Sequence, residues 1–143
     1  MNVLDLNNKN IKQFNSIMKG NCIILFHHPQ CGHCIELRPA WEKVKQMNAD
    51  KPINIMEIES DMLSKINHPI KNSVRGFPQI VRLENGKVMS EFNKLRNVEN
   101  LNEFVNQNLI KRKNINRSLN VTIKKKRKRN KKKTKARKKK RLT

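Results

Sequence analysis

The sequence of 143 residues contains only three cysteines and no hydrophobic run of the length that a membrane span requires. Three cysteines are too few for the disulfide scaffold of a small secreted domain. A transmembrane helix needs about 18–20 consecutive apolar residues, so we expect no transmembrane segment. Met1–Asp5 has neither the basic nor the apolar region of a signal peptide, and Lys140–Thr143 is not a retention signal. We therefore expect an intracellular protein, in the cytoplasm, the nucleus or nucleolus, or a virion.

Acidic residues are missing from the C-terminal part of the chain. Residues 111–143 contain 19 Lys and Arg and no Asp or Glu. The other 14 basic residues, against 11 acidic ones, leave residues 1–110 with a net charge of only +3 out of +22. A tail so charged repels itself and cannot bury enough apolar surface to fold. The sequence therefore predicts one domain over 1–111 and a disordered, Lys/Arg-rich tail over 112–143.

Apolar periodicity predicts strands and helices within the domain. Two β-branched runs, at 22–27 and 53–59, are typical of buried strands, and apolar residues at helical spacing predict a helix over 32–48 that contains Pro39. An earlier helix is expected to begin at Asn7 or Asn8 and to end at Gly20.

The second half of the domain has a strong hairpin signal. A short helix and loop over about 61–74 are followed by Asn85-Gly86, which predicts a turn between strands 79–84 and 87–92. Asn97 is expected to cap a last helix, whose core positions are Val98, Leu101, Phe104, Val105 and Leu109. This order predicts an α/β fold with a central mixed β-sheet flanked by helices.

Cys31 and Cys34 lie where the first buried strand gives way to a helix. The free amides and the dipole of a helix N-terminus favour an anion, so the first sulfur can lose its proton more easily. The alternative is a structural zinc site, but zinc takes four ligands and the chain offers no second Cys-x-x-Cys, only Cys22 and four scattered histidines. We therefore predict a redox-active dithiol and no metal.

The sequence resembles the thioredoxin superfamily, and within it the catalytic domains of protein disulfide isomerases. The resemblance covers most of residues 1–110. It depends on four features in order: Cys31-Gly32-His33-Cys34 with Pro39 five residues later, Arg75-Gly76-Phe77-Pro78, the hairpin Asn85-Gly86-Lys87, and Phe92 followed by Arg96. It implies a thioredoxin fold, and no cofactor beyond a redox-active Cys31–Cys34 disulfide.

The resemblance also implies roles for individual residues. Cys31 would be the exposed nucleophile and Cys34 the buried thiol that releases the mixed disulfide. His33 would stabilise the Cys31 thiolate, and Arg96 would help the buried thiol to lose its proton. A cis-proline would face the dithiol across a groove for an extended substrate, lined by Phe77, Pro78 and Gln30.

Three positions depart from the family pattern. Leu25 stands where the family has a buried acid that exchanges a proton with the second thiol, and Glu57 or Glu59 is a candidate replacement. Gln30 replaces the aromatic residue before the first cysteine. Gln79 replaces the usual threonine after the cis-proline.

Other conspicuous side chains have simpler interpretations. We expect Cys22, Trp41 and Phe104 to be core residues and Arg75 to be a solvated surface group. One of the adjacent pair His27 and His28 is expected to pack where the family has an aromatic side chain.

The residues between the cysteines indicate the direction of the chemistry. Gly-His is the isomerase pattern. The reduction potentials of protein disulfide isomerase and thioredoxin are about −180 and −270 mV, and for a two-electron couple this difference corresponds to roughly 4 kcal/mol. We therefore predict a thiol–disulfide oxidoreductase of the isomerase type, a monomer with protein thiols and disulfides as substrates. The alternative is a non-catalytic, thioredoxin-fold binding or structural protein, which the absence of the buried acid favours.

The tail favours sequence-independent binding to a polyanion, nucleic acid above all, because it has many positive charges and residues 124–143 have no aromatic side chain to stack on bases. A solubility appendage and a nuclear or nucleolar address are the alternatives. An anionic membrane is a weaker one, because no apolar or lipid anchor accompanies the charge. The isomerase motif without a secretory signal also suggests a virus or organelle with its own disulfide pathway. The densest basic cluster is Lys124, Lys125, Lys126, Arg127, Lys128 and Arg129.

Overall fold

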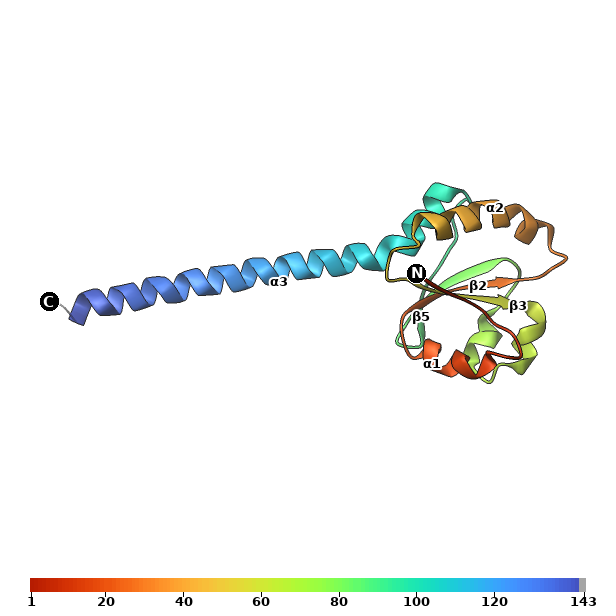
Figure 1. The fold of residues 1–143 in the computed structure, drawn as a ribbon, viewed down its shortest axis with the longest axis horizontal. Helices are drawn as coiled ribbons and strands as arrows, with labels where there is room; N and C mark the ends of the chain where they lie inside the picture. The colour runs from red at the N-terminus through yellow and green to blue at the C-terminus, as the bar shows by residue number, and fades with distance from the viewer. Residues whose placement is uncertain (142–143) are drawn as a thin grey trace. The chain divides into compact units, whose positions relative to one another are not determined.

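The computed structural model describes residues 1–141, except for the side chains of residues 108–113. The chain divides into two compact units, Met1–Val105 and the residues from Asn106 onward. The first unit alternates strands with helices (Figure 1), in the order β1 (Asn2–Asp5), η1 (Ile11–Gln13), α1 (Phe14–Met18), β2 (Cys22–His27), α2 (Gly32–Met47), β3 (Asn54–Glu59), η2 (Ser60–Lys65), η3 (Pro69–Ser73), β4 (Gln79–Glu84), β5 (Lys87–Glu91) and the start of α3 (Val98–Arg141).

The five strands form one mixed sheet in the order β1-β3-β2-β4-β5. β3 pairs in parallel with both β1 and β2, while β4 is antiparallel to β2 and to β5. The three central strands are almost continuously buried because helices cover both of their faces. This is the mixed, helix-flanked sheet that the sequence predicted.

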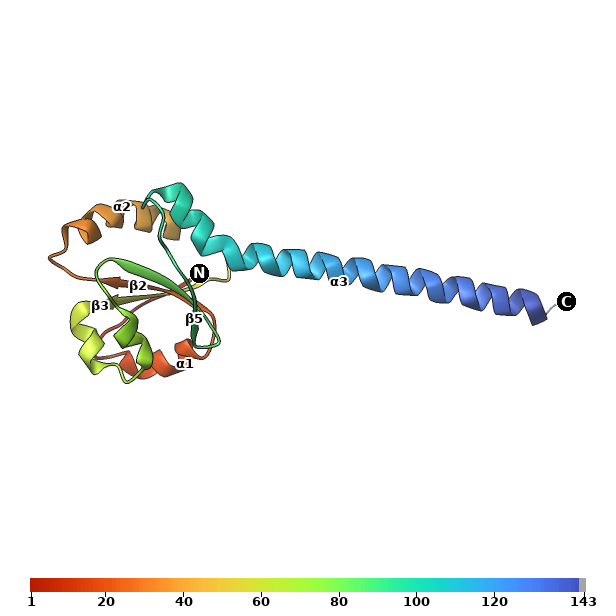
Figure 2. The ribbon, with the colours of Figure 1, turned by 180° about the vertical axis from the view of Figure 1, so that it is seen from behind.

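Alternating side chains of the sheet build two separate cores. On β2, Ile24 and Phe26 belong to a cluster that includes Phe14 and Met18 of α1. Figures 1 and 2 show α1 on one side of the sheet and α2, with the first turns of α3, on the other. The α2 side buries Leu37, Trp41, Val44, Leu101, Phe104 and Val105.

The hairpin between β4 and β5 has the predicted turn. Asn85 and Gly86 both have positive φ, 52° and 77°, as a two-residue turn of the type I′ family requires. Gly86 is needed for a second reason: a Cβ there would lie 3.0 Å from the carbonyl oxygen of Met18. The hairpin therefore packs closely on the end of α1.

The first and last elements of the domain differ in part from the sequence expectations. β1 was not predicted, because four residues on a sheet edge with little burial carry no periodic signal. The first helix is limited to η1 and α1, and Asn7 instead accepts hydrogen bonds from the amides of Lys9 and Asn10. Asn97 caps α3 as predicted, since its side-chain oxygen accepts a hydrogen bond from the amide of Asn100. Leu109, a predicted core position, lies outside the described side chains.

The basic tail also differs from expectation, since α3 continues as a helix to Arg141 instead of becoming disordered after residue 111. Lys and Arg have helix propensities close to that of Leu, and no Gly or Pro follows Gly86 to interrupt the helix. The side chains at 114–141 are all exposed, so this part of the helix depends on local propensity and not on a core. The compact unit ends at Val105, six residues before the predicted boundary. No helix within residues 1–141 is long and apolar enough to cross a membrane.

Candidate active site

Cys31 is the N-cap residue of α2. Its backbone is extended, with φ −88° and ψ 118°, and its Sγ accepts a hydrogen bond from the amide of Cys34 at 3.2 Å. A hydrogen bond from the Cys34 thiol lowers the pKa of Cys31, and the amides of Cys34 and His33 lower it further. The predicted link between a helix N-terminus and a reactive thiol is thus present in the geometry.

Cys34 lies one turn further along α2 and is buried. Burial raises the pKa of its thiol, and so does the hydrogen bond that this thiol makes with Cys31. Both cysteines are free thiols. The pair therefore has one accessible thiol with a lowered pKa and one buried thiol with a raised pKa.

Phe77 and Pro78 lie opposite the dithiol. Their peptide bond is cis, and the Cys31 thiol donates a hydrogen bond to the carbonyl oxygen of Phe77 at 3.4 Å. The buried side chain of Gln79 fixes this loop, since it accepts from the amide of Arg75 and donates to the carbonyl of Ser73. Gln79 thus has a clear structural role in place of the threonine that the family uses.

The two polar residues predicted beside Cys31 lie at the edge of the site. The His33 ring is 71% exposed and pairs with Glu36 at 3.4 Å, so only the His33 amide contacts the Cys31 sulfur. Gln30 is exposed, and its amide donates to Nδ1 of His28, whose ring lies 5.9 Å from that of Phe77. Of the pair His27 and His28, His28 thus lies against the ring of Phe77, and which of the two stands in for the family's aromatic side chain stays a prediction.

A dithiol at the N-terminus of a helix, opposite a cis-proline, is the arrangement that the resemblance implied. The family model described as Thioredoxin matches residues 2–107. The chain belongs to the thioredoxin family.

Its relatives include protein disulfide isomerases. The chain is 30% identical over 107 residues to a protein disulfide-isomerase of Datisca glomerata, which covers 72% of this chain and 21% of that protein. It is 33% identical over 89 residues to protein disulfide-isomerase erp38 of Neurospora crassa. This match covers 61% of this chain and 24% of that protein. This thioredoxin-family chain thus spans about a fifth to a quarter of these relatives' lengths.

The same fold occurs among solved structures. The first thioredoxin domain of mouse protein disulfide-isomerase A4 superimposes with a TM-score of 0.56 at 26% identity, over 72% of each chain. The predicted thioredoxin fold and the likeness to isomerase domains are therefore confirmed.

Arg96 acts on both thiols of this thioredoxin-family site. The residue is exposed, and its positive charge lowers the pKa of Cys31 and opposes the rise in the pKa of Cys34. This is the smallest of the influences on either thiol, and the part of Arg96 in deprotonating Cys34 stays a prediction.

The position of the family's buried acid is filled by an apolar side chain. Leu25 is buried on β2 and lines a small cavity together with Cys34. Glu57, one of two suggested replacements, is the register partner of Leu25 on β3. Its Oε1 accepts hydrogen bonds from Trp41 Nε1 at 2.8 Å and from Lys45 Nζ at 2.7 Å. Burial raises the pKa of Glu57, but these bonds and the charge of Lys45 outweigh it, so the net pKa is lowered.

Sequence reasoning missed this network, in which Trp41 and Lys45 of α2 donate hydrogen bonds to Glu57 of β3. The spacing of Trp41 and Lys45, four residues apart on a helix, was the available signal.

The other singled-out residues are not part of the dithiol site. Cys22 is buried in the core below α1, and burial raises its pKa to about 11, so it is an unreactive thiol. Arg75 is 85% exposed and lies 3.9 Å from Glu91. Among the described residues, no three His, Cys, Asp or Glu side chains gather as metal ligands would.

Proposed function

We propose that the protein is a thiol–disulfide oxidoreductase of the disulfide-isomerase type, with the Cys31–Cys34 pair as its redox centre and protein thiols and disulfides as substrates. The observation that carries the proposal is the asymmetry of the two thiols. The pKa of accessible Cys31 is lowered, whereas the pKa of buried Cys34 is raised. Disulfide exchange needs this division, because the first sulfur must attack as a thiolate and the second must wait until the mixed disulfide has formed.

The surroundings of Cys31 support a protein substrate. Cys31 contacts the carbonyl of Phe77, beside cis-Pro78, so a substrate segment bound at this edge would meet backbone groups next to the reactive sulfur. The Gly-His pair between the cysteines supports isomerase character over thioredoxin-like reduction.

Reduction of insulin and reactivation of scrambled ribonuclease test this function. We expect activity in both assays, and Cys31→Ser is expected to abolish both. Cys22→Ala is the matched control. The Cys22 thiol is buried and takes no part in the proposed exchange, so this variant should retain activity. Activity retained in Cys31→Ser would refute the mechanism.

The non-catalytic alternative has one observation in its favour, namely that Leu25 replaces the family's acid. It requires Cys31 to behave as an ordinary thiol, with a pKa near 8.5. The rate of alkylation by iodoacetamide against pH separates the two functions, since the catalytic one requires a midpoint clearly below that value.

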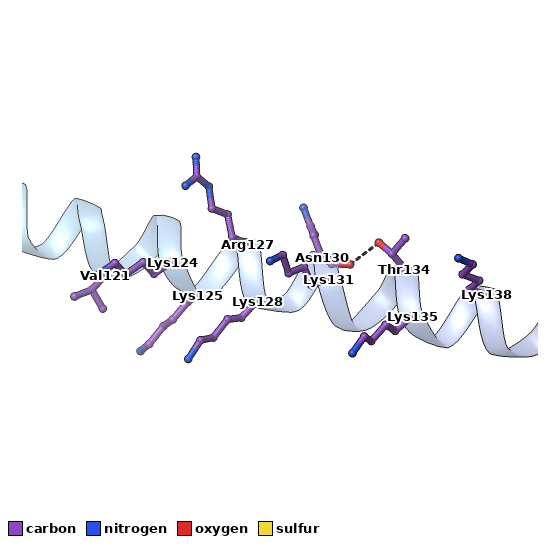
Figure 3. Close-up of a pocket in the computed structure, with 10 residues that line it drawn as sticks. All are labelled: Val121, Lys124, Lys125, Arg127, Lys128, Asn130, Lys131, Thr134, Lys135 and Lys138. Carbon is purple, nitrogen blue, oxygen red and sulfur yellow. Dashed lines mark hydrogen bonds between the residues drawn. The ribbon is translucent and has the colours of Figure 1, made fainter.

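For the tail we propose electrostatic binding to nucleic acid. Figure 3 shows that the charged side chains project on different sides of the helix, so the pocket that they line is a shallow hollow open to solvent. The only hydrogen bond drawn there is internal, from Thr134 Oγ1 to the Asn130 carbonyl at 2.8 Å. A helix charged on every side supports binding to phosphates without sequence readout.

The test of the tail is the affinity for a labelled DNA duplex and a labelled RNA across a salt series. Binding should weaken steeply with salt, by a slope of about 0.9 per phosphate contact in logarithmic units. Replacement of Lys124–Arg129 by glutamines should reduce both the affinity and the slope and leave insulin reduction unchanged. An affinity that does not depend on salt would contradict the electrostatic account.

A further inference from the structure

The proposed exchange reaction leaves one chemical requirement unmet, and the inference drawn from it rests on that proposed function. Cys34 is buried and must lose its proton before it can attack the mixed disulfide on Cys31. Leu25 cannot accept a proton. Some other group near Cys34 must therefore do so.

A small cavity adjoins the Cys34 side chain between β2 and α2. Its volume is about 10 Å³, at the lower limit for a single water molecule. Its lining combines apolar and polar side chains: Leu25, His27, Cys34, Leu37, Arg38 and Trp41. A water in this cavity would have polar partners on both the strand and the helix.

His27 is the group in this lining that can accept a proton. Two residues after Leu25 on β2, it lies on the same face of the sheet, towards α2. Its Nε2 is buried and has no hydrogen-bond partner among the described residues. A buried ring nitrogen without a partner is costly, and a water in the adjoining cavity would satisfy it.

The titratable groups near His27 are less suitable as proton acceptors. Glu57 is held by Trp41 and Lys45, its pKa is lowered, and it does not line the cavity. Glu59 pairs with His27 in register on β3 but does not line the cavity either. Arg38 lines it, but a guanidinium cannot accept a proton.

We propose that His27 accepts the proton of Cys34 through one water molecule in this cavity, in place of the acid absent at Leu25. The Cys34 S–H bond breaks, the water takes that proton, and it passes one of its own protons to the lone pair of Nε2. The Cys34 thiolate then attacks the sulfur of Cys31 and forms the Cys31–Cys34 bond. The electron pair of the broken mixed disulfide leaves on the substrate sulfur, which takes a proton from solvent, and His27 later releases its own.

The experiment separates the two thiols in time. Reduced protein is mixed with dithiobis(nitrobenzoate) in a stopped-flow instrument, and released thionitrobenzoate is followed by its absorbance. The first release reports attack by Cys31, and the second, whose rate does not depend on concentration, reports attack by Cys34. His27→Phe should slow the second phase at least about tenfold and leave the first within about twofold. The control is His68→Asn. His68 is the N-cap residue of η3, its Nδ1 accepts from the Ile70 amide, and its replacement should change neither phase.

A rescue variant distinguishes proton transfer from packing. Adding Leu25→Glu to His27→Phe places an acid beside the same cavity and should restore the second phase to within about threefold of the original chain. If His27→Phe does not fold, His27→Gln replaces it, since Gln is polar but cannot titrate.

An unchanged second phase in a folded His27 variant would overturn the proposal, and so would a failure of Leu25→Glu to restore it. These results differ from a failure of the proposed function, in which the original chain itself would show no second release.

Discussion

Removal of the Lys45 side-chain charge should destabilise the domain through Glu57. The two side chains are 15% and 11% exposed and their charged atoms are 2.7 Å apart, so Lys45→Met leaves a nearly buried carboxylate with one partner, Trp41. Loss of one member of a buried pair costs about 3–5 kcal/mol, and the partial exposure favours the lower end, about 3 kcal/mol. For a domain of this size that lowers the melting temperature by about 12–24 °C.

The assay is urea unfolding followed by circular dichroism, and a second variant isolates the charge. Lys45→Met combined with Glu57→Gln removes the carboxylate but keeps an oxygen that can accept from Trp41. This double variant should recover most of the lost stability. A loss below about 1 kcal/mol in Lys45→Met, or no recovery in the double variant, would refute the argument.

The same pair predicts a pH dependence with a definite sign. Because the pKa of Glu57 is lowered from 4.5 in the folded protein, its contribution is fully present above about pH 4.5 and is lost as the pH falls through the folded value. In Lys45→Met the buried Glu57 carboxylate has lost its cation. Protonation of Glu57 at low pH therefore removes an unpaired buried charge from the variant. The stability difference between the two proteins should therefore shrink on acidification, and a constant difference would contradict the pairing.

Two further predictions concern the thiols and the hairpin. Arg96→Met should raise the pKa of Cys31 and shift its iodoacetamide alkylation profile to higher pH. The shift should be smaller at high salt, because Arg96 is exposed. An unchanged profile would show that Arg96 has no influence on Cys31. Gly86→Ala should lower the free energy of unfolding in urea by about 1–2 kcal/mol, because φ is 77° and the new Cβ would lie 3.0 Å from the Met18 carbonyl oxygen. An unchanged free energy of unfolding would mean that α1 shifts away without cost.

Local patterns were sufficient to predict most of the fold. The β-branched run of β2, the periodicity of α2 and the Asn85-Gly86 turn each specify their element within a few residues. The position of Cys31 at a helix N-terminus follows from the boundary between the first two of these. Phe77-Pro78 was placed opposite the dithiol by family resemblance, since nothing local in the sequence brings residues 46 apart together.

Features that depend on tertiary packing were not predictable in the same way. The bonds from Trp41 and Lys45 to Glu57 join α2 to β3, and the cavity beside His27 exists only once β2 and α2 are packed. The helix at 112–141 was missed because charge repulsion was weighed above propensity in a segment without Gly or Pro.

The reduction potential of the Cys31–Cys34 pair, measured by equilibration with glutathione buffers, tests the central claim most directly. The account predicts a two-electron couple near the value of protein disulfide isomerases, about −180 mV. A value near −270 mV would indicate a thioredoxin-like reductant instead. A pair that does not equilibrate with glutathione at all would contradict the proposed exchange chemistry.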